Sequence, residues 1–181
     1  SQVITLSQGQ FFGEMSLISG RRRSATVIAG NGCVLIETPR RSMNKLIQSV
    51  EAVKRIIDEA FLMRAIQAQV APDTPAEKLA DLVHTATIET YNAGEILFSE
   101  GDPGDSLHLI RVGSVTASRN IGDREVVMSY IPAGHYVGEM ALLSDAPRSA
   151  TIRAAVRTET IRLEGQLFKD LLELLLCQQI H

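Results

Sequence analysis

A direct internal repeat constrains the fold of this chain more than any other feature of its sequence. Residues 13–26 read GEMSLISGRRRSAT, and residues 138–151 read GEMALLSDAPRSAT, at a constant offset of 125 residues and without a gap. Nine of the fourteen aligned positions are identical, whereas two unrelated segments would share about one. The chain therefore contains a duplication, and the repeated segment is the first candidate for a functional site.

The two copies differ in what precedes them. Upstream of the second copy, apolar and polar residues alternate between turns rich in Gly, Pro, Asn and Asp, which predicts short strands of a barrel or sandwich over residues 85–91, 95–99, 106–118 and 125–131. Only eleven residues precede Phe12 in the first copy. The first copy thus lacks its opening strands. We expect the chain to be a segment of a longer protein, with the alternative that another chain supplies the missing strands.

Helices are predicted between and after the copies. Apolar residues recur at i, i+3, i+4 and i+7 from Arg41 to Ala71, which predicts one amphipathic helix of about eight turns, ended by Pro72 and Pro75. A short helix through Val83 and another over residues 166–175 follow. The polar face of the long helix is not basic, so we expect it to pack on its own barrel or on a partner helix rather than on a membrane.

Composition excludes several classes of protein. A chain of 181 residues holds one or two domains, and 45% hydrophobic with 22% charged residues is ordinary for a globular protein. The net charge of −3 gives no general attraction to nucleic acid or anionic membranes. The sequence contains no run of 18 apolar residues, so it predicts no membrane-spanning helix. Two cysteines without a CxxC pattern suit a reducing compartment. We therefore expect a cytoplasmic protein with no nucleic-acid partner.

Each copy of the repeat joins a Gly-Glu pair to an Arg nine residues after the Glu. The segment between them reads as one helical turn, whose first N–H groups favour an anion, and an Arg binds a phosphate through two parallel hydrogen bonds. The Glu is better suited to accept a hydrogen bond from a hydroxyl group. This pattern predicts a site for a sugar phosphate. The alternative is a surface salt bridge, but both copies retain both residues.

The repeated strings Phe12–Thr26 and Gly138–Thr151 resemble the phosphate-binding cassette of cyclic-nucleotide-binding domains, and Gly94–Leu107 with Gly113–Val115 resemble early barrel strands of that family. We call residues 13–26 the first cassette and residues 138–151 the second. The resemblance implies a mainly β fold with flanking helices: jelly-roll domains in tandem. Residues 1–71 would be the C-terminal part of a first domain plus the long helix. Residues 72–181 would be a second domain with a truncated lid helix.

The resemblance also assigns roles to residues. Glu14 and Glu139 would bind the ribose 2′-hydroxyl, and Arg23 and Arg148 the cyclic phosphate. Backbone groups of the cassettes would complete the site. The full set of expected ligand-binding residues is Gly13, Glu14, Met15, Ser16, Arg23, Ser24, Ala25, Gly138, Glu139, Met140, Ala141, Arg148, Ser149 and Ala150. In the first cassette, Gly20, Arg21 and Arg22 replace Asp145, Ala146 and Pro147, and we expect the two extra arginines to be solvated.

Other residues with reactive side chains are scattered. We expect Cys33 and Cys177 to be structural, His84 and His108 to lie at element edges, and His135 to lie in a turn. No nucleophile–base motif, Walker loop or metal-ligand spacing is present in the sequence. The sequence therefore predicts no catalytic residue, no metal and no cofactor.

The functional expectation is a regulatory module that senses a cyclic nucleotide, with cAMP favoured over cGMP, and controls an attached or associated effector. The resemblance leaves the base preference open, because in this family a hydroxyl after the Arg, as in Ser24 and Ser149, can bind guanine and also occurs in cAMP binders. A homodimer through the long helix is a further possibility. Two alternatives remain: an interaction module that binds no nucleotide, and the regulatory part of an enzyme whose catalytic domain lies elsewhere.

Overall fold

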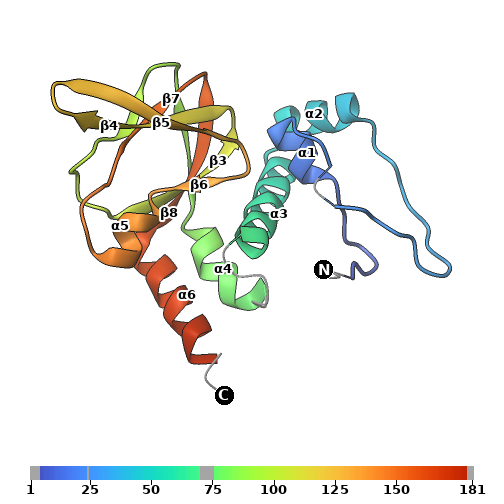
Figure 1. Cartoon of the computed structure of the whole chain (residues 1–181). Helices are drawn as coiled ribbons and strands as arrows, with labels where there is room; N and C mark the ends of the chain where they lie inside the picture. Colours follow the sequence, from blue (N-terminus) through green and yellow to red (C-terminus); the bar gives the residue numbers. More distant parts are fainter. Residues whose placement is uncertain (1–4, 24, 70–75, 179–181) are drawn as a thin grey trace. The chain divides into compact units, whose positions relative to one another are not determined.

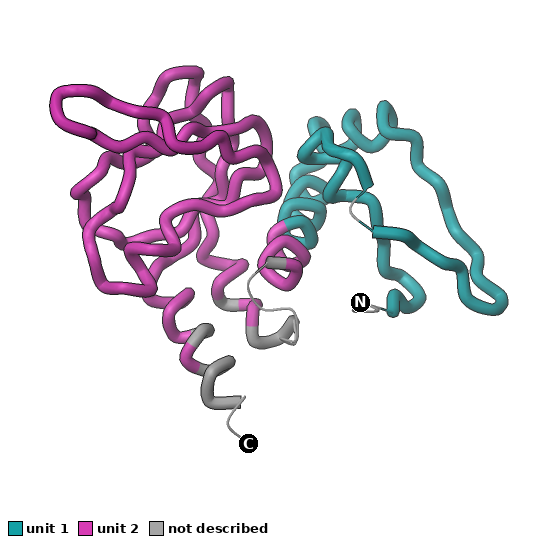
Figure 2. Tube along the Cα trace, viewed as in Figure 1, with its two compact units in different colours: residues 1–61 teal, residues 62–181 magenta. Residues whose placement is uncertain are grey.

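The computed structural model describes residues 5–23, 25–69 and 76–178. The chain divides into two compact units, residues 1–61 and residues 62–181 (Figure 2). The division falls inside a helix, and the predicted domain boundary after residue 71 lies outside the described residues. In the described part of the chain, no helix combines the length and apolar character that a membrane crossing requires.

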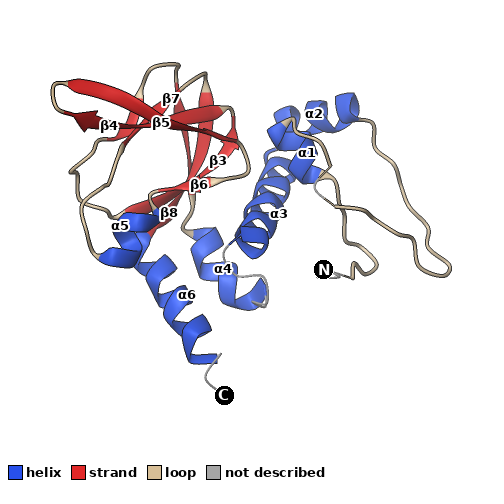
Figure 3. Cartoon of the chain, in the orientation of Figure 1, coloured by secondary structure: helices blue, strands red, loops and turns tan. Residues whose placement is uncertain are grey.

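The second unit is a β barrel built from two four-stranded antiparallel sheets (Figures 1 and 3). One sheet has the order β1-β8-β3-β6 and the other the order β2-β7-β4-β5. The strands are β1 (Thr87–Tyr91), β2 (Ile96–Phe98), β3 (Ser106–Val112), β4 (Ser114–Ile121), β5 (Arg124–Pro132), β6 (Tyr136–Val137), β7 (Thr151–Ala154) and β8 (Thr158–Glu164). The predicted class, mainly β with flanking helices, is confirmed.

Alternation along the strands builds the core between the two sheets. Ile110 of the first sheet meets Val115 and Ile152 of the second sheet in one buried cluster, because successive side chains of a strand point to opposite faces. The opposite face of the first sheet carries Leu107 and Leu163, which are also buried. The helices α4 (Ala76–His84) and α6 (Gly165–Gln178) contact each other and the strand β8, and α6 also contacts β3. Both faces of β3 are therefore covered.

One predicted strand, residues 106–118, is wrong, since the structure divides it into β3 and β4 at Gly113. Gly113 has φ +87, and a Cβ atom there would lie 2.7 Å from the carbonyl oxygen of Arg157. A positive φ and a close backbone neighbour both require glycine. The chain thereby passes from one sheet to the other, which period-two alternation does not show.

The predicted single helix over residues 41–71 is also wrong. The structure has α2 (Arg40–Ser49) and α3 (Glu51–Gln69), with Val50 extended between them at φ −129 and ψ 103. The Val50 N–H donates to Leu46, and its carbonyl oxygen accepts hydrogen bonds from Val53 and Lys54. Val50 thus makes the last N–H bond to α2 and accepts the first bonds of α3, and a β-branched residue suits this extended position. The apolar period continues on both sides of Val50, so it does not reveal the break.

The first unit contains α1 (Glu14–Ser19), α2 and the start of α3. Residues 25–38 leave α1 and return to α2 through a turn at Asn31 and Gly32, where φ is +67 at the glycine. Within this described segment no residue is assigned to a strand. We call residues 25–38 the arm. Its apolar side chains are exposed: Val27, Ile28, Val34, Leu35 and Ile36.

Candidate functional site: the anion-binding cassettes

The second cassette is a short helix between a strand and a loop, and the residue at each end of this helix has a left-handed backbone conformation. Gly138 follows β6 with φ +96 and precedes α5 (Glu139–Ser144), and Asp145 ends the helix with φ 48. The first N–H groups of such a helix have no partner within the helix. The backbone of Arg148 is fixed to the loop before β3, since its N–H donates to Asp102 over 2.8 Å and its carbonyl accepts from Gly101 over 2.9 Å.

Arg148 is the best-fixed charged side chain of this cassette, and the residue is only 3% exposed. Its Nη1 donates to the carbonyl oxygens of Ser106, over 2.9 Å, and Gly138, over 3.1 Å. Its Nη2 donates to Ser106 Oγ over 3.1 Å. The guanidinium carbon lies 4.0 Å from the centre of the Phe98 ring, a favourable cation–π distance. These contacts hold the guanidinium in one orientation before any ligand arrives.

The charge of Arg148 is only partly balanced. Asp105 Oδ1 lies 3.5 Å from Nη2, and the same carboxylate contacts Arg162 at 3.1 Å. A hydrogen bond from the Ser106 hydroxyl lowers the pKa of Asp105, which keeps it ionised. Burial lowers the pKa of Arg148, but a guanidinium stays protonated in proteins. Arg148 Nε is buried without a hydrogen-bond partner among the described residues. A buried cation with an unused donor favours an incoming anion.

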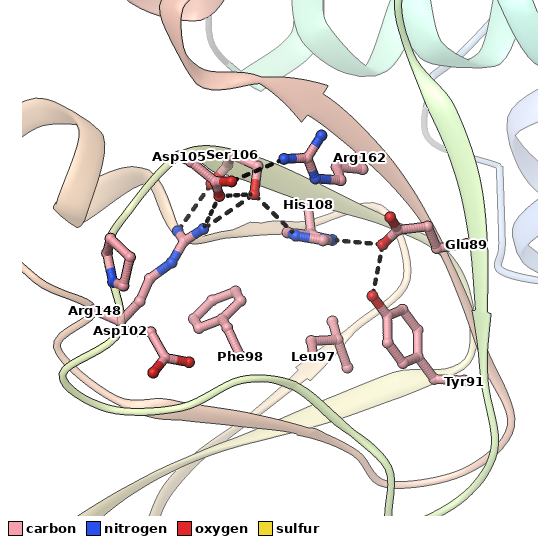
Figure 4. A pocket seen from close by; sticks show the side chains of 11 residues that line it. Glu89, Tyr91, Leu97, Phe98, Asp102, Asp105, Ser106, His108, Arg148 and Arg162 are labelled. Carbon is pink, nitrogen blue, oxygen red and sulfur yellow. Dashed lines mark hydrogen bonds and ion pairs between the residues drawn. The ribbon is translucent and has the colours of Figure 1, made fainter.

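A cavity of about 310 Å³ lies beside Arg148 (Figure 4). It is lined by side chains from β1, β2, β3 and β8 and from the loop before β3: Glu89, Tyr91, Leu97, Phe98, Asp102, Pro103, Asp105, Ser106, His108 and Arg162, together with Arg148. Of the expected ligand-binding residues that the structure describes, Arg148 alone lines this cavity. Arg148 therefore belongs to the cassette and also faces the cavity.

The other expected residues of the second cassette lie around α5. Glu139 is half-buried in the first turn, where its charge favours the protonated form of Arg148. Met140 and Ser149 are exposed, and Ser149 Oγ lies 3.9 Å from the Met140 sulfur atom. Ala141 is buried, while Ala150 packs against the core. These residues therefore lie on α5 or in the loop that follows it.

The first cassette repeats this geometry. Gly13 has φ +99 and precedes α1, and Arg23 Nη1 donates to the Gly13 carbonyl oxygen over 3.1 Å, the same distance as between Arg148 and Gly138. Arg23 also donates to Ser16 Oγ over 2.8 Å, but Arg23 is exposed. Glu14 is buried. Gly13, Glu14, Ser16 and Arg23 line a cavity of about 440 Å³ within the first unit.

The other described residues of the first cassette differ in how exposed they are. Met15 is half-buried and Ala25 is exposed, whereas Ser24 lies outside the described residues. Arg21 and Arg22 are exposed, as expected for the two extra arginines.

A sequence profile described as "Cyclic nucleotide-binding domain" matches residues 1–50 and 88–174. The chain belongs to the cyclic nucleotide-binding domain family. The matched ranges include both cassettes and the strands that the structure describes in the second unit, except for Thr87 at the start of β1.

Similar proteins include regulatory subunits of cAMP-dependent protein kinase. That of Eremothecium gossypii is 33% identical over 172 residues, which are 94% of this chain and 36% of the relative. That of Dictyostelium discoideum is 31% identical over 173 residues, 93% of this chain and 52% of the relative. The chain thus spans about a third to a half of the length of these curated relatives.

Solved structures show the same likeness. The regulatory domain of Toxoplasma gondii PKA, crystallised with cAMP, is 25% identical with a TM-score of 0.61, covering 93% of this chain and 66% of that one. A cyclic nucleotide-binding-like protein from Brucella abortus is 28% identical with a TM-score of 0.54, covering 61% of this chain and 97% of that one. Both comparisons agree with the family assignment.

Sequence reasoning missed several residues around Arg148 in this cyclic nucleotide-binding domain. The expectation that His108 lies at an element edge is wrong: it is buried within β3 and lines the cavity. Ser106 and His108 are two residues apart and so share one face of the strand. This spacing is visible in the sequence and could have placed the two side chains together. Phe98 comes from another strand, and only the folded sheets bring it to Arg148.

Glycine at position 138 is required by both conformation and space. Its φ is +96, and a Cβ atom would lie 2.5 Å from Arg148 Nη1 and 3.1 Å from the Ser106 carbonyl oxygen. We expect Gly138→Ala to cost about 1–2 kcal/mol for the left-handed backbone alone and more for displacing Arg148. Urea unfolding and nucleotide titration would measure both effects.

Gly94→Ala is the matched control, because Gly94 has φ +89 and no atom within 4 Å of its Cβ position. It should lose stability through backbone strain and leave nucleotide affinity unchanged. Equal effects of the two substitutions on affinity would show that the space beside Arg148 is not needed.

Proposed function

We propose that the second unit binds a cyclic nucleotide, with cAMP preferred, and that binding regulates an effector. The observation that carries the proposal is Arg148: a buried, pre-oriented cation with an unused Nε donor beside the start of α5. The cyclic phosphate is a compact monoanion that suits one guanidinium and the N–H groups of a helix turn. Glu139 would accept a hydrogen bond from the ribose 2′-hydroxyl.

The geometry also connects the anion site to a helix that can transmit binding. Asp105 contacts the Arg148 guanidinium through its carboxylate, and its carbonyl oxygen accepts a hydrogen bond from the N–H of Gly165 over 2.9 Å. Gly165 is the first residue of α6. A ligand that draws Arg148 toward its phosphate would change the balance of charge at Asp105 and bias the position of α6. Binding and helix position would then be coupled reciprocally.

We also propose that the chain contains parts of two such domains and that its effector is a protein kinase. Residues 1–71 would be the C-terminal part of a first cyclic nucleotide-binding domain, and residues 72–181 a second one, supported by the matching geometry of the two cassettes. The names of the relatives favour a protein kinase as the effector. A homodimer through α2 and α3 and a cytoplasmic location stay predictions.

Calorimetric titration with cAMP and cGMP tests the proposal. We expect saturable binding with the higher affinity for cAMP. A preference for cGMP that disappears in Ser149→Ala would reverse the choice of base. Failure to bind either nucleotide would favour the interaction module that binds no nucleotide.

The role of Glu139 has its own test. Glu139→Gln should weaken cAMP binding by about threefold to tenfold, because a neutral amide oxygen replaces the charged carboxylate as the acceptor for the ribose hydroxyl. It should weaken 2′-deoxy-cAMP much less, since that analogue lacks the hydroxyl. Equal losses for the two nucleotides would contradict the assignment of Glu139 to the ribose.

A further inference from the structure

Ser106 is the residue on which the orientation of Arg148 most depends. Its carbonyl oxygen and its Oγ each accept one hydrogen bond from the guanidinium. The hydroxyl proton goes to Asp105 Oδ1 over 2.8 Å, because an ionised carboxylate can only accept. Ser106 is itself buried. A serine hydroxyl with three polar neighbours in such a place needs each of them in a fixed donor or acceptor role.

His108 is the third neighbour of that hydroxyl, with Nε2 at 3.4 Å from Ser106 Oγ. The single Ser106 proton is used by Asp105, and the Arg148 nitrogen only donates, so His108 Nε2 must carry a proton and donate to Oγ. The other ring nitrogen, Nδ1, lies 3.3 Å from Thr160 Oγ1 and then accepts from that hydroxyl. The hydrogen bonds therefore select the neutral Nε2–H tautomer.

The charged groups that face His108 act in both directions, since the two carboxylates favour a protonated ring and the two arginines a neutral one. They are Glu89 on β1, Asp105 before β3, Arg148 before β7 and Arg162 on β8. Glu89 Oε2 is 3.7 Å from Nδ1, but it already accepts a hydrogen bond from the Tyr91 hydroxyl over 2.6 Å. Burial lowers the pKa of His108 to about 4. The ring thus adds no positive charge beside Arg148 at neutral pH.

The same ring supports Arg148 by a second route. The ring centres of His108 and Phe98 are 5.8 Å apart with an interplanar angle of 46°, and Phe98 in turn lies against the guanidinium. Figure 4 shows His108 beside Ser106 and opposite the Phe98 ring. His108 thereby contacts both residues that hold the guanidinium in place, one by a polar contact and one by packing.

We propose that His108 is a positioning residue for anion binding, which holds Arg148 in its binding orientation through Ser106 and Phe98. This inference rests on the proposed function, since the anion in question is the cyclic phosphate. The contacts of His108 reach the guanidinium through Ser106 and Phe98. Its effect is on how much reorientation Arg148 requires when the ligand arrives.

Two variants separate the polar route from the packing route. His108→Phe keeps an aromatic ring against Phe98 and removes the donor to Ser106, so cAMP affinity should fall about threefold to tenfold, the range for one hydrogen bond. His108→Gln can place an amide N–H near the Nε2 position and should recover most of that loss. His84→Phe, at the exposed end of α4, is the control and should bind as the original chain does.

A nitrogen-15 NMR measurement supplies a readout that a merely structural role would not move. It should show His108 as the Nε2–H tautomer from pH 8 to pH 5, and the Arg148 Nε–H signal should shift or broaden in His108→Phe. An Nδ1–H tautomer, or unchanged cAMP affinity in His108→Phe, would overturn the inference. Loss of cAMP binding by the original chain would instead overturn the proposed function, and the NMR signals would still report whether His108 orients Arg148.

Discussion

Replacing Arg148 with alanine should weaken cAMP binding at the second cassette by at least tenfold and up to a hundredfold or more. A hydrogen bond to a charged group contributes about 1.5–3 kcal/mol, and about 1.4 kcal/mol is tenfold in affinity. The substitution also leaves the carbonyl oxygens of Ser106 and Gly138 without their guanidinium partner. Arg148→Lys should recover little, because an ammonium group lacks the planar fork. Isothermal calorimetry on the whole chain measures the cAMP affinity of both variants.

The matched control for this experiment is Arg153→Ala. Arg153 lies on β7, a short distance along the same segment, donates to the Gly94 carbonyl oxygen over 2.9 Å and forms an exposed ion pair with Glu125. Exposed ion pairs contribute little, so cAMP affinity should change less than twofold. Unchanged affinity in Arg148→Ala would remove Arg148 from the phosphate site.

The sequence predicted the helical turn of the second cassette because that feature is local. In both units a glycine with positive φ, +99 at Gly13 and +96 at Gly138, precedes a short helix, and an Arg follows that helix. The helical turn expected between the Glu and the Arg is α5 in the second copy, and the Arg returns to the carbonyl oxygen of the first glycine in each copy. Contacts between residues this close in sequence are fixed by the motif itself.

The cavity beside Arg148 could not be predicted in the same way. Glu89, Phe98 and His108 come from three strands, and their meeting depends on sheet order and register. Period-two alternation fixes which residues share a face of a strand, but not which strands become neighbours. The division at Gly113 follows from that same arrangement, since glycine is needed there both for a positive φ and for the close approach of the Arg157 backbone.

The second large effect concerns the arm of the first unit. At the repeat offset of 125 residues, Val27 corresponds to Ile152 and Ile36 to Ile161. In the barrel, Ile152 and Ile161 are 4% and 2% exposed between neighbouring strands. Val27 and Ile36 are 54% and 94% exposed. The arm therefore presents core-type side chains to solvent, and a surface of this kind favours association with other strands.

We accordingly expect the 181-residue chain to self-associate in solution, with a mass from light scattering that rises with concentration. Covering the arm requires strands like β1–β4, which pair with β7 and β8 in the second unit. The double substitution Val27→Ser and Ile36→Ser should reduce association, because each removes apolar surface from the arm. Ile121→Ser, at an exposed apolar position in β4, is the control and should not. A monomer at all concentrations, with one cooperative unfolding transition, would show that the arm needs no cover.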